Sequence, residues 1–170
     1  NRHVIRWATQ GFANVIRAEG EEAMQKGVAV CMDCRNHSAE FARETACVMA
    51  ANGIHVRLFE SLRPTPELSF AVREYGCQAG VNVTASHNPK EYNGYKVYWA
   101  DGAQLPPQHA AAIADELTRI DIFTGVRSMD YEQALAEGRI ELLGEDCDRR
   151  FMANVMGMVN DYETVKKVAD

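Results

Sequence analysis

One segment in the middle of the chain combines the side chains that nucleophilic chemistry requires. Two apolar residues, Val81 and Val83, precede a loop rich in hydroxyl, imidazole and amide groups. Ser86 is the candidate nucleophile, although a serine hydroxyl is weak at neutral pH and needs a base or a metal ion. His87 is adjacent and can carry a proton near neutral pH. The pattern predicts a nucleophilic serine at the carboxyl end of a strand, where open α/β sheets bind ligands.

Two lysines lie near this serine in the sequence. Lys90 and Lys96 follow Ser86 by four and ten positions, and a pre-placed cation can stabilise a transferring phosphoryl group. A purely structural interpretation stays open, because Asn88 and Pro89 favour a turn. Adjacent serine and histidine residues are not a catalytic triad, which is defined by spatial geometry. The sequence contains neither of the glycine-rich nucleotide-binding motifs.

Composition excludes several classes of protein. The 170 residues carry a formal net charge of −6, with 46 % apolar and 25 % charged residues, as in a folded domain. There is no apolar run of about 18 residues, so no membrane span is predicted. The negative charge argues against nucleic-acid partners.

The five cysteines include a pair, Cys31 and Cys34, at the end of a strand-like apolar run. Residues three apart on a strand face opposite sides of the sheet. The pair is therefore interpreted as incidental, and not as a redox or zinc motif. Reduced thiols in a chain with an ordinary core favour a cytoplasmic location.

Strand and helix patterns alternate around the loop. Short apolar or alternating runs predict strands at 28–32, 54–59, 81–83 and 95–99. Helices are predicted over 9–19, from Ser38 as N-cap to Gly53, from Pro66 to Tyr75, and after Pro107. The link between Val83 and Tyr95 is too short for a helical crossover, so that strand is predicted to be antiparallel. The fold class is therefore α/β: a three-layer α/β/α sandwich with a mixed, mostly parallel sheet.

The last part of the chain is less regular. A short edge strand is predicted over 139–143 and a helix over 146–159. Met152, Met156 and Met158 are interpreted as packing residues of that helix. We expect residues 1–145 to form one domain and residues 146–170 to be a linker helix toward a second domain.

A longer motif resembles a known family. The loop Thr84-Ala85-Ser86-His87-Asn88-Pro89 and the following residues 92–98 resemble the active-site signature of the phosphoglucomutase/phosphomannomutase, or α-D-phosphohexomutase, family. Asp33-Cys34-Arg35 and Pro64-Thr65-Pro66 resemble two further segments of that family. The resemblance covers residues 7–125 well and is greatest to the branch of bacterial phosphoglucomutases and phosphopentomutases.

The resemblance implies a role for each signature residue. Ser86 would be a phosphoserine that converts a sugar monophosphate, by default glucose-1-phosphate to glucose-6-phosphate, through a bisphosphate. His87 and Lys96 would be catalytic, and an oxygen of the phosphorylated Ser86 would complete a Mg²⁺ site. Hexose 1,6-bisphosphate would be the activator. Phosphomannose and phosphopentose substrates stay open.

Three residues are candidates for binding substrate or phosphate: Arg35, Asn88 and Lys90. Arg35 has two other interpretations, which are holding the loop and forming a structural salt bridge.

The family's other motifs are not found in this chain. A Gly-Thr-x-Gly-x-Arg-Gly segment would precede Asn1, and the Asp-Gly-Asp-Gly-Asp-Arg metal loop and the sugar-reading Gly-Glu-x-Ser-Gly loop are absent from the sequence. We therefore expect a first domain without its N-terminal strand, inactive when isolated. Its partners would be a sugar phosphate and the remaining domains of a parent chain. The alternative is a non-catalytic domain that binds a phosphorylated ligand or a partner protein.

Overall fold

The computed structural model describes residues 1–167, and its strands form one five-stranded sheet in the order β4-β3-β1-β2-β5. The strands are β1 (Val28–Met32), β2 (Val56–Phe59), β3 (Ala79–Val83), β4 (Tyr95–Trp99) and β5 (Ile140–Leu143). Strand β1 is parallel to β2 and β3, β2 is parallel to β5, and β4 is antiparallel to β3. The mixed, mostly parallel sheet is confirmed, including the antiparallel strand that the short link implied.

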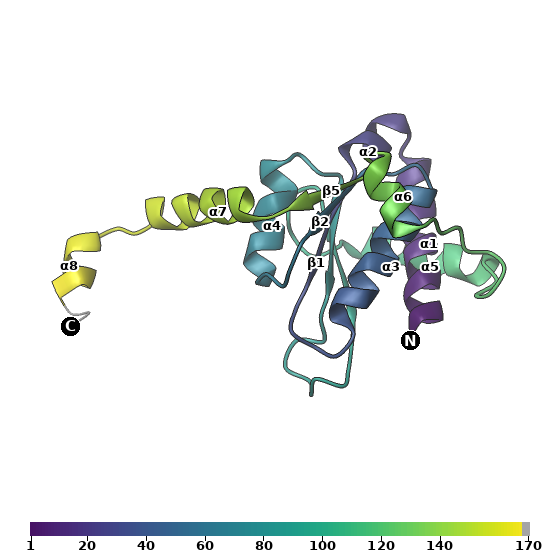
Figure 1. Ribbon diagram of the computed structural model, residues 1–170, viewed down its shortest axis with the longest axis horizontal. Coiled ribbons are helices and arrows are strands. Elements are labelled where there is room, and N and C mark those ends of the chain that lie inside the picture. Colours follow the sequence, from purple (N-terminus) through teal and green to yellow (C-terminus); the bar gives the residue numbers. More distant parts are fainter. Residues whose placement is uncertain (168–170) are drawn as a thin grey trace.

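Helices cover both faces of this sheet (Figure 1). One face carries α1 (Arg2–Ala18) and α3 (Ser38–Ala51), with α5 (Pro107–Arg119) packed against α1. The other face carries α4 (Thr65–Glu74) and the beginning of α7 (Glu145–Gly157). Phe12 and Met49 pack on the first face and Leu68 on the second. The three-layer α/β/α class is confirmed.

Strand β1 explains the unbroken apolar run in the sequence. All five of its residues are buried, because alternate side chains enter the cores on opposite faces: Val28 and Val30 on the α1 side, Ala29 and Cys31 on the α4 side. The thiol of Cys31 donates to the carbonyl oxygen of Arg63 at 3.2 Å, and burial raises its pKa to about 12. Cys34 is exposed. Neither thiol forms a disulfide, and the interpretation of the pair as incidental stays a prediction.

The helices differ from the sequence predictions in two ways: some begin or end at other residues, and some short helices were missed. Helix α1 begins earlier than predicted, because the Asn1 side chain accepts the amide of Val4 at 3.1 Å and caps it. Ser38 is the first helical residue and not the N-cap; His37 occupies that position in a left-handed conformation, φ 63°. Two short helices were not predicted: α2 (Glu21–Lys26) and α6 (Tyr131–Ala136). Within the predicted linker helix 146–170, residues 158–161 are not helical and separate α7 from a second helix, α8 (Tyr162–Lys167).

The C-terminal helices leave the body of the protein as an arm. Figure 1 shows α7 running outward from α4 and the edge of the sheet, with α8 at its far end. Only the first turns of α7 are packed: Cys147 is buried, and the ring centroids of Phe151 and Phe70 lie 5.7 Å apart. Met152, Met156 and Met158 are 53 %, 43 % and 70 % exposed. The packing interpretation of these methionines is wrong, because α4 is too short to cover them. The boundary at residue 145 stays a prediction.

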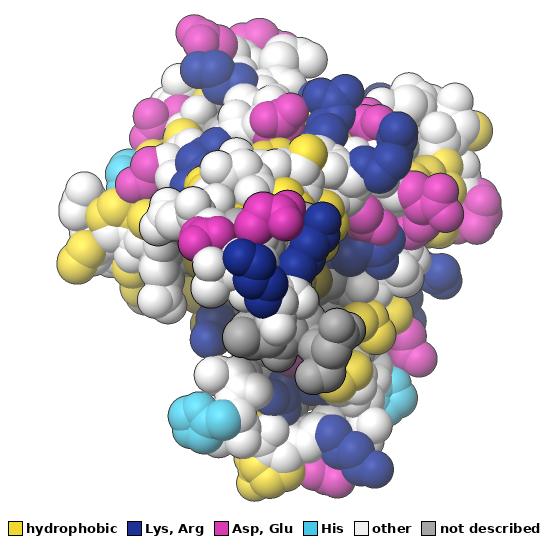
Figure 2. Space-filling model, turned by 90° about the vertical axis from the view of Figure 1, so that its left-hand side faces the viewer, with side chains coloured by type: hydrophobic (Ala, Val, Ile, Leu, Met, Phe, Trp, Pro, Cys, Tyr) yellow, Lys and Arg dark blue, Asp and Glu magenta, His cyan; other side chains and the backbone are white. Residues whose placement is uncertain are grey.

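Charge is mixed on the face seen along this arm. Figure 2 shows lysine and arginine side chains interspersed with acidic ones, so the visible face carries no continuous basic stripe. Among the described helices, none is long and apolar enough to cross a bilayer.

A charged cluster ties α7 to the body. Arg63 makes a two-pronged ion pair with Asp148 of α7, with Nε to Oδ1 at 2.6 Å and Nη2 to Oδ2 at 2.8 Å. Glu67, in the first turn of α4, is buried beside them. Burial, and next the adjacent Asp148, raise the pKa of Glu67 to about 7. Hydrogen bonds from Arg63 lower the pKa of Asp148. The cluster is most favourable with Glu67 protonated and Asp148 ionised.

We expect this cluster to make thermal stability fall as the pH rises from about 5 to about 8. A carboxyl group whose pKa moves from its ordinary 4.5 up to about 7 stabilises the fold while protonated, and that stability disappears as the pH passes the folded-state value. Asp148 has the opposite sign, but its contribution is lost only at acid pH. Calorimetric Tm values across this range are the measurement. Glu67→Gln should flatten the profile, and exposed Glu19→Gln is the control. An unchanged slope in Glu67→Gln would contradict the assignment.

Candidate active site at the carboxyl ends of β1 and β3

The signature loop, residues 84–94, starts where two parallel strands end. The amide of Thr84 donates to the carbonyl oxygen of Gly94 at 3.1 Å and closes the base of the loop. Asp33 directly follows β1, and its amide donates to Val83 at 3.3 Å. The Thr84 hydroxyl donates to Asp33 Oδ2 at 2.6 Å. The loop therefore lies at the edge where open α/β sheets bind ligands.

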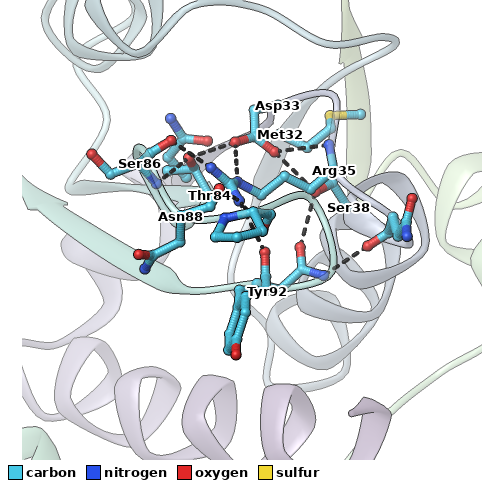
Figure 3. Close-up of polar contacts among 12 residues, drawn as sticks. Met32, Asp33, Arg35, Ser38, Thr84, Ser86, Asn88 and Tyr92 are labelled. Atoms are coloured by element: carbon cyan, nitrogen blue, oxygen red, sulfur yellow. Dashed lines mark hydrogen bonds and ion pairs between the residues drawn. The ribbon is translucent and has the colours of Figure 1, made fainter.

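Arg35 holds the loop from the inside. Its Nη1 donates to the carbonyl oxygens of Asn88, Pro89 and Tyr92 at 2.7, 2.8 and 3.2 Å, and its Nη2 donates to that of Ser86. Figure 3 shows the guanidinium inside the ring of backbone that these residues form. The Arg35 side chain is only 7 % exposed. Of the roles considered for Arg35, the structure shows loop-holding and the ion pair; its role in binding phosphate stays a prediction.

Asp33 anchors this arginine and is a residue that the sequence analysis did not select. Its carboxylate accepts from Arg35 Nε at 2.7 Å and from the Ser38 hydroxyl at 3.0 Å. Burial acts to raise the pKa of Asp33, but the hydrogen bonds from Thr84, Arg35 and Ser38 outweigh it and lower the pKa. The signal was its position: a carboxylate at the end of a strand parallel and adjacent to the one that precedes Ser86.

Ser86 adopts an uncommon backbone conformation. Its φ is 59°, in the left-handed region that few residues other than glycine adopt. The amide of Asn88 donates to the Ala85 carbonyl at 3.1 Å, so Ser86 and His87 are the central residues of a turn. The turn alternative therefore describes the backbone correctly, and Ser86 stays a candidate nucleophile. The Ser86 side chain is exposed and points away from the ring held by Arg35 (Figure 3).

The other candidate residues lie on this loop and on β4, and within residues 1–167 no hydrogen bond joins their side chains to Ser86. His87, Asn88 and Lys90 are exposed on the same loop, and Lys96 is half-buried on β4. Within residues 1–167, neither His87 nor Lys96 makes a side-chain hydrogen bond or ion pair. The structure thus brings Ser86, Asp33 and Arg35 into one hydrogen-bonded network and leaves the side chains of His87, Lys90 and Lys96 outside it.

The described residues do not by themselves form a metal site. No group of three histidine, cysteine or acidic side chains in residues 1–167 is arranged to hold a metal ion. Asp33 is the one carboxylate in the loop network, and its oxygens already accept from Arg35, Ser38 and Thr84. The residues present therefore do not fit a complete Mg²⁺ site.

The signature loop lies on open surface. A cavity of about 650 Å³ lies between α1, α3 and residues 128–132, and none of the signature residues lines it. Its arginines Arg2 and Arg6 both pair with Glu44. The chemistry-bearing residues thus lie outside this cavity.

Fold and loop together define a class: an α/β domain that presents a serine at the carboxyl edge of a mixed sheet. A family model described as phosphoglucomutase/phosphomannomutase, alpha/beta/alpha domain I, matches residues 1–122. The chain belongs to the phosphoglucomutase/phosphomannomutase family and contains its domain I. The resemblance found in the sequence is confirmed.

Relatives with different names share this domain. The chain is 31 % identical over 163 residues to a phosphoglucomutase of Staphylococcus saprophyticus, covering 96 % of the chain and 29 % of that protein. It is 44 % identical over 117 residues to a probable phosphoribomutase of Schizosaccharomyces pombe, covering 66 % and 20 %. A putative phosphomannomutase from Thermus thermophilus superimposes with a TM-score of 0.70 at 28 % identity, covering 84 % and 29 %. The chain spans less than a third of each relative's length.

Proposed function

We propose that this chain is the phosphoserine-bearing domain of a sugar-phosphate mutase, with Ser86 as the group that gives and takes back the phosphoryl group. The observation that carries the proposal is the exposed, left-handed Ser86 on a loop that Arg35 holds rigidly. Such strain is found at functional sites, where surrounding contacts maintain it. Glucose-1-phosphate and glucose-6-phosphate are the proposed substrate pair. Phosphomannose and phosphopentose remain alternatives, since relatives carry phosphoglucomutase and phosphopentomutase names.

The reaction needs two transfers at one atom. A sugar hydroxyl attacks the phosphorus of phosphorylated Ser86, the Oγ–P bond breaks, and the hydroxyl proton leaves to a base. After the bisphosphate turns around, Ser86 Oγ attacks the other phosphorus, and the sugar oxygen released takes up a proton. His87 is the local candidate for carrying these protons. Lys90, Lys96 and the side-chain amide of Asn88 would stabilise phosphate oxygens.

We propose that the domain alone does not turn over substrate. Ser86 lies on open surface, and efficient phosphoryl transfer requires positioning from several sides and exclusion of water. The remaining contacts would come from other domains of a longer protein, with hexose 1,6-bisphosphate as activator. Mutase turnover by the isolated 170-residue chain would refute this point.

Mapping phosphate on the complete gene product tests the proposal. We expect peptide mass spectrometry to find a phosphoryl group on Ser86 and to find it lost after addition of a sugar monophosphate. Ser128, which is exposed on a different face, is the internal control and should stay unmodified. If Ser86 carries no phosphate before or after incubation with hexose 1,6-bisphosphate, the non-catalytic binding domain becomes the better assignment.

A further inference from the structure

Asn82 is a polar residue inside a buried strand. It is 1 % exposed on β3, between two valines. Its side chain lies on the face that α4 covers, since Nδ2 donates to Thr65 Oγ1 at the start of α4 at 2.8 Å. Its Oδ1 is shielded from solvent and has no hydrogen-bond partner in the part of the chain that the structure describes. A buried carbonyl oxygen without a donor is destabilising, so a donor within reach would stabilise the fold.

Two side chains flank Asn82 across the sheet. The register pairs it with Cys31 of β1 and with Lys96 of β4, and directly opposed residues stand on the same face. The single proton of Cys31 is already donated to the Arg63 carbonyl. Lys96 offers three N–H donors and makes no hydrogen bond or ion pair within the described residues. Of these two neighbours, Lys96 is thus the one with unused N–H donors.

We propose that Asn82 is a positioning residue for Lys96: when the lysine side chain turns toward β3, Asn82 Oδ1, which has no partner in the conformation described, accepts a hydrogen bond from the ammonium and fixes that cation beside the Ser86 loop. The inference deepens the proposed function, because it assigns Lys96 its place near the phosphoryl group. Lys96 lies two positions after Gly94, where the loop ends. Its flexible stem gives the cation many positions, and one fixed acceptor selects among them. Two N–H groups then remain for phosphate oxygens.

The orientation of the Asn82 amide is the critical feature. With Nδ2 directed at Thr65, the carbonyl oxygen is the atom available to Lys96. In the opposite orientation the Thr65 hydroxyl would donate to Oδ1, and the remaining NH₂ group would not accept from an ammonium. Thr65 is the middle residue of the Pro64-Thr65-Pro66 segment, so this turn places the hydroxyl that the Asn82 amide contacts.

Solvent exchange of the lysine ammonium protons, measured by ¹⁵N NMR on this chain, is the test. We expect the Lys96 protons to exchange about tenfold more slowly than those of exposed Lys90, equivalent to roughly 1.4 kcal/mol, or one hydrogen bond to a charged group. Asn82→Leu, similar in volume and without an acceptor, should abolish the difference. Asn82→Asp, which keeps an oxygen in place, should preserve it. Equal exchange of Lys96 and Lys90 in the wild type would overturn the inference, whether or not the variants fold.

This test does not depend on mutase activity, so the two proposals can fail separately. Slow exchange at Lys96 together with an unphosphorylated Ser86 would support the hydrogen bond and refute the phosphoserine. Fast exchange together with a phosphorylated Ser86 would do the reverse. In the active complete protein, Asn82→Leu should lower kcat about tenfold and leave KM nearly unchanged, because the bond positions a cation used in the transition state. A rise in KM alone would contradict that role.

Discussion

Replacing Ser86 with alanine should lower mutase turnover of the complete protein by on the order of 10⁴- to 10⁶-fold, the scale seen when a covalent enzyme loses its nucleophile. In the proposed mechanism both transfers use Ser86 Oγ, so no part of that cycle would survive its removal. The residue is exposed and its hydroxyl makes no contact within residues 1–167. We therefore expect Tm to stay nearly constant. A coupled assay with glucose-1-phosphate and hexose 1,6-bisphosphate, repeated with mannose and pentose phosphates, is the measurement.

Two controls separate chemistry from conformation. Ser128→Ala removes an equally exposed hydroxyl and should leave turnover unchanged. Ser86→Gly also lacks the nucleophile but relieves the φ of 59°, so it should be inactive yet more stable by about 1 kcal/mol. Turnover in Ser86→Ala within tenfold of wild type would refute the phosphoserine role.

Replacing Arg35 with alanine should loosen the signature loop and reduce turnover about 10²-fold or more, because small displacements of a reacting group have effects of that size. The change removes the donors to four loop carbonyls and leaves Asp33 without its cation. The free energy of unfolding should fall by roughly 2–3 kcal/mol. Hydrogen exchange of residues 84–94 should accelerate, since the ring of backbone loses its centre.

The conservative variant is informative for Arg35. Arg35→Lys should fail to restore the loop. An ammonium lacks the planar, forked shape with which the guanidinium reaches several carbonyls and a carboxylate at the same time. Arg119→Ala is the control: this exposed arginine pairs with Asp115 and Glu116 on α5, and its loss should change stability by no more than about 0.5 kcal/mol. Unchanged loop exchange in Arg35→Ala would mean that the strand ends alone hold the loop.

Local patterns were sufficient to predict most of the sheet. The run Val28–Met32 could be recognised as a strand buried on both faces, and the short link before Tyr95 required an antiparallel neighbour. Helices α2 and α6 could not be predicted, because six residues are too few to show a hydrophobic period. The exposed methionines of α7 have a helical spacing, but that spacing does not show whether a partner covers them.

The sequence was enough to choose candidate site residues, a choice that stays a prediction, but it did not show their contacts. Ser86 and Lys96 stand out by type and position, but the partners of Arg35 lie 51 to 57 positions further along the chain. No pattern of spacing specifies where such a guanidinium points. The positive φ of Ser86 and the unpaired oxygen of Asn82 depend on that tertiary arrangement as well.

The place of β5 at the edge of the sheet has a consequence for synthesis. Strands β1 to β4 come from residues 28–99, so four neighbours can pair before Ile140 is translated and joins Val56. Until then the outer side of β2 is an unpaired ladder, and such edges are templates for pairing with another chain. The late strand therefore covers the outer side of β2, and β5 then becomes the edge strand on that side of the sheet. Helix α7 follows β5 in the chain, so it can pack against α4 only after β5 has been synthesised.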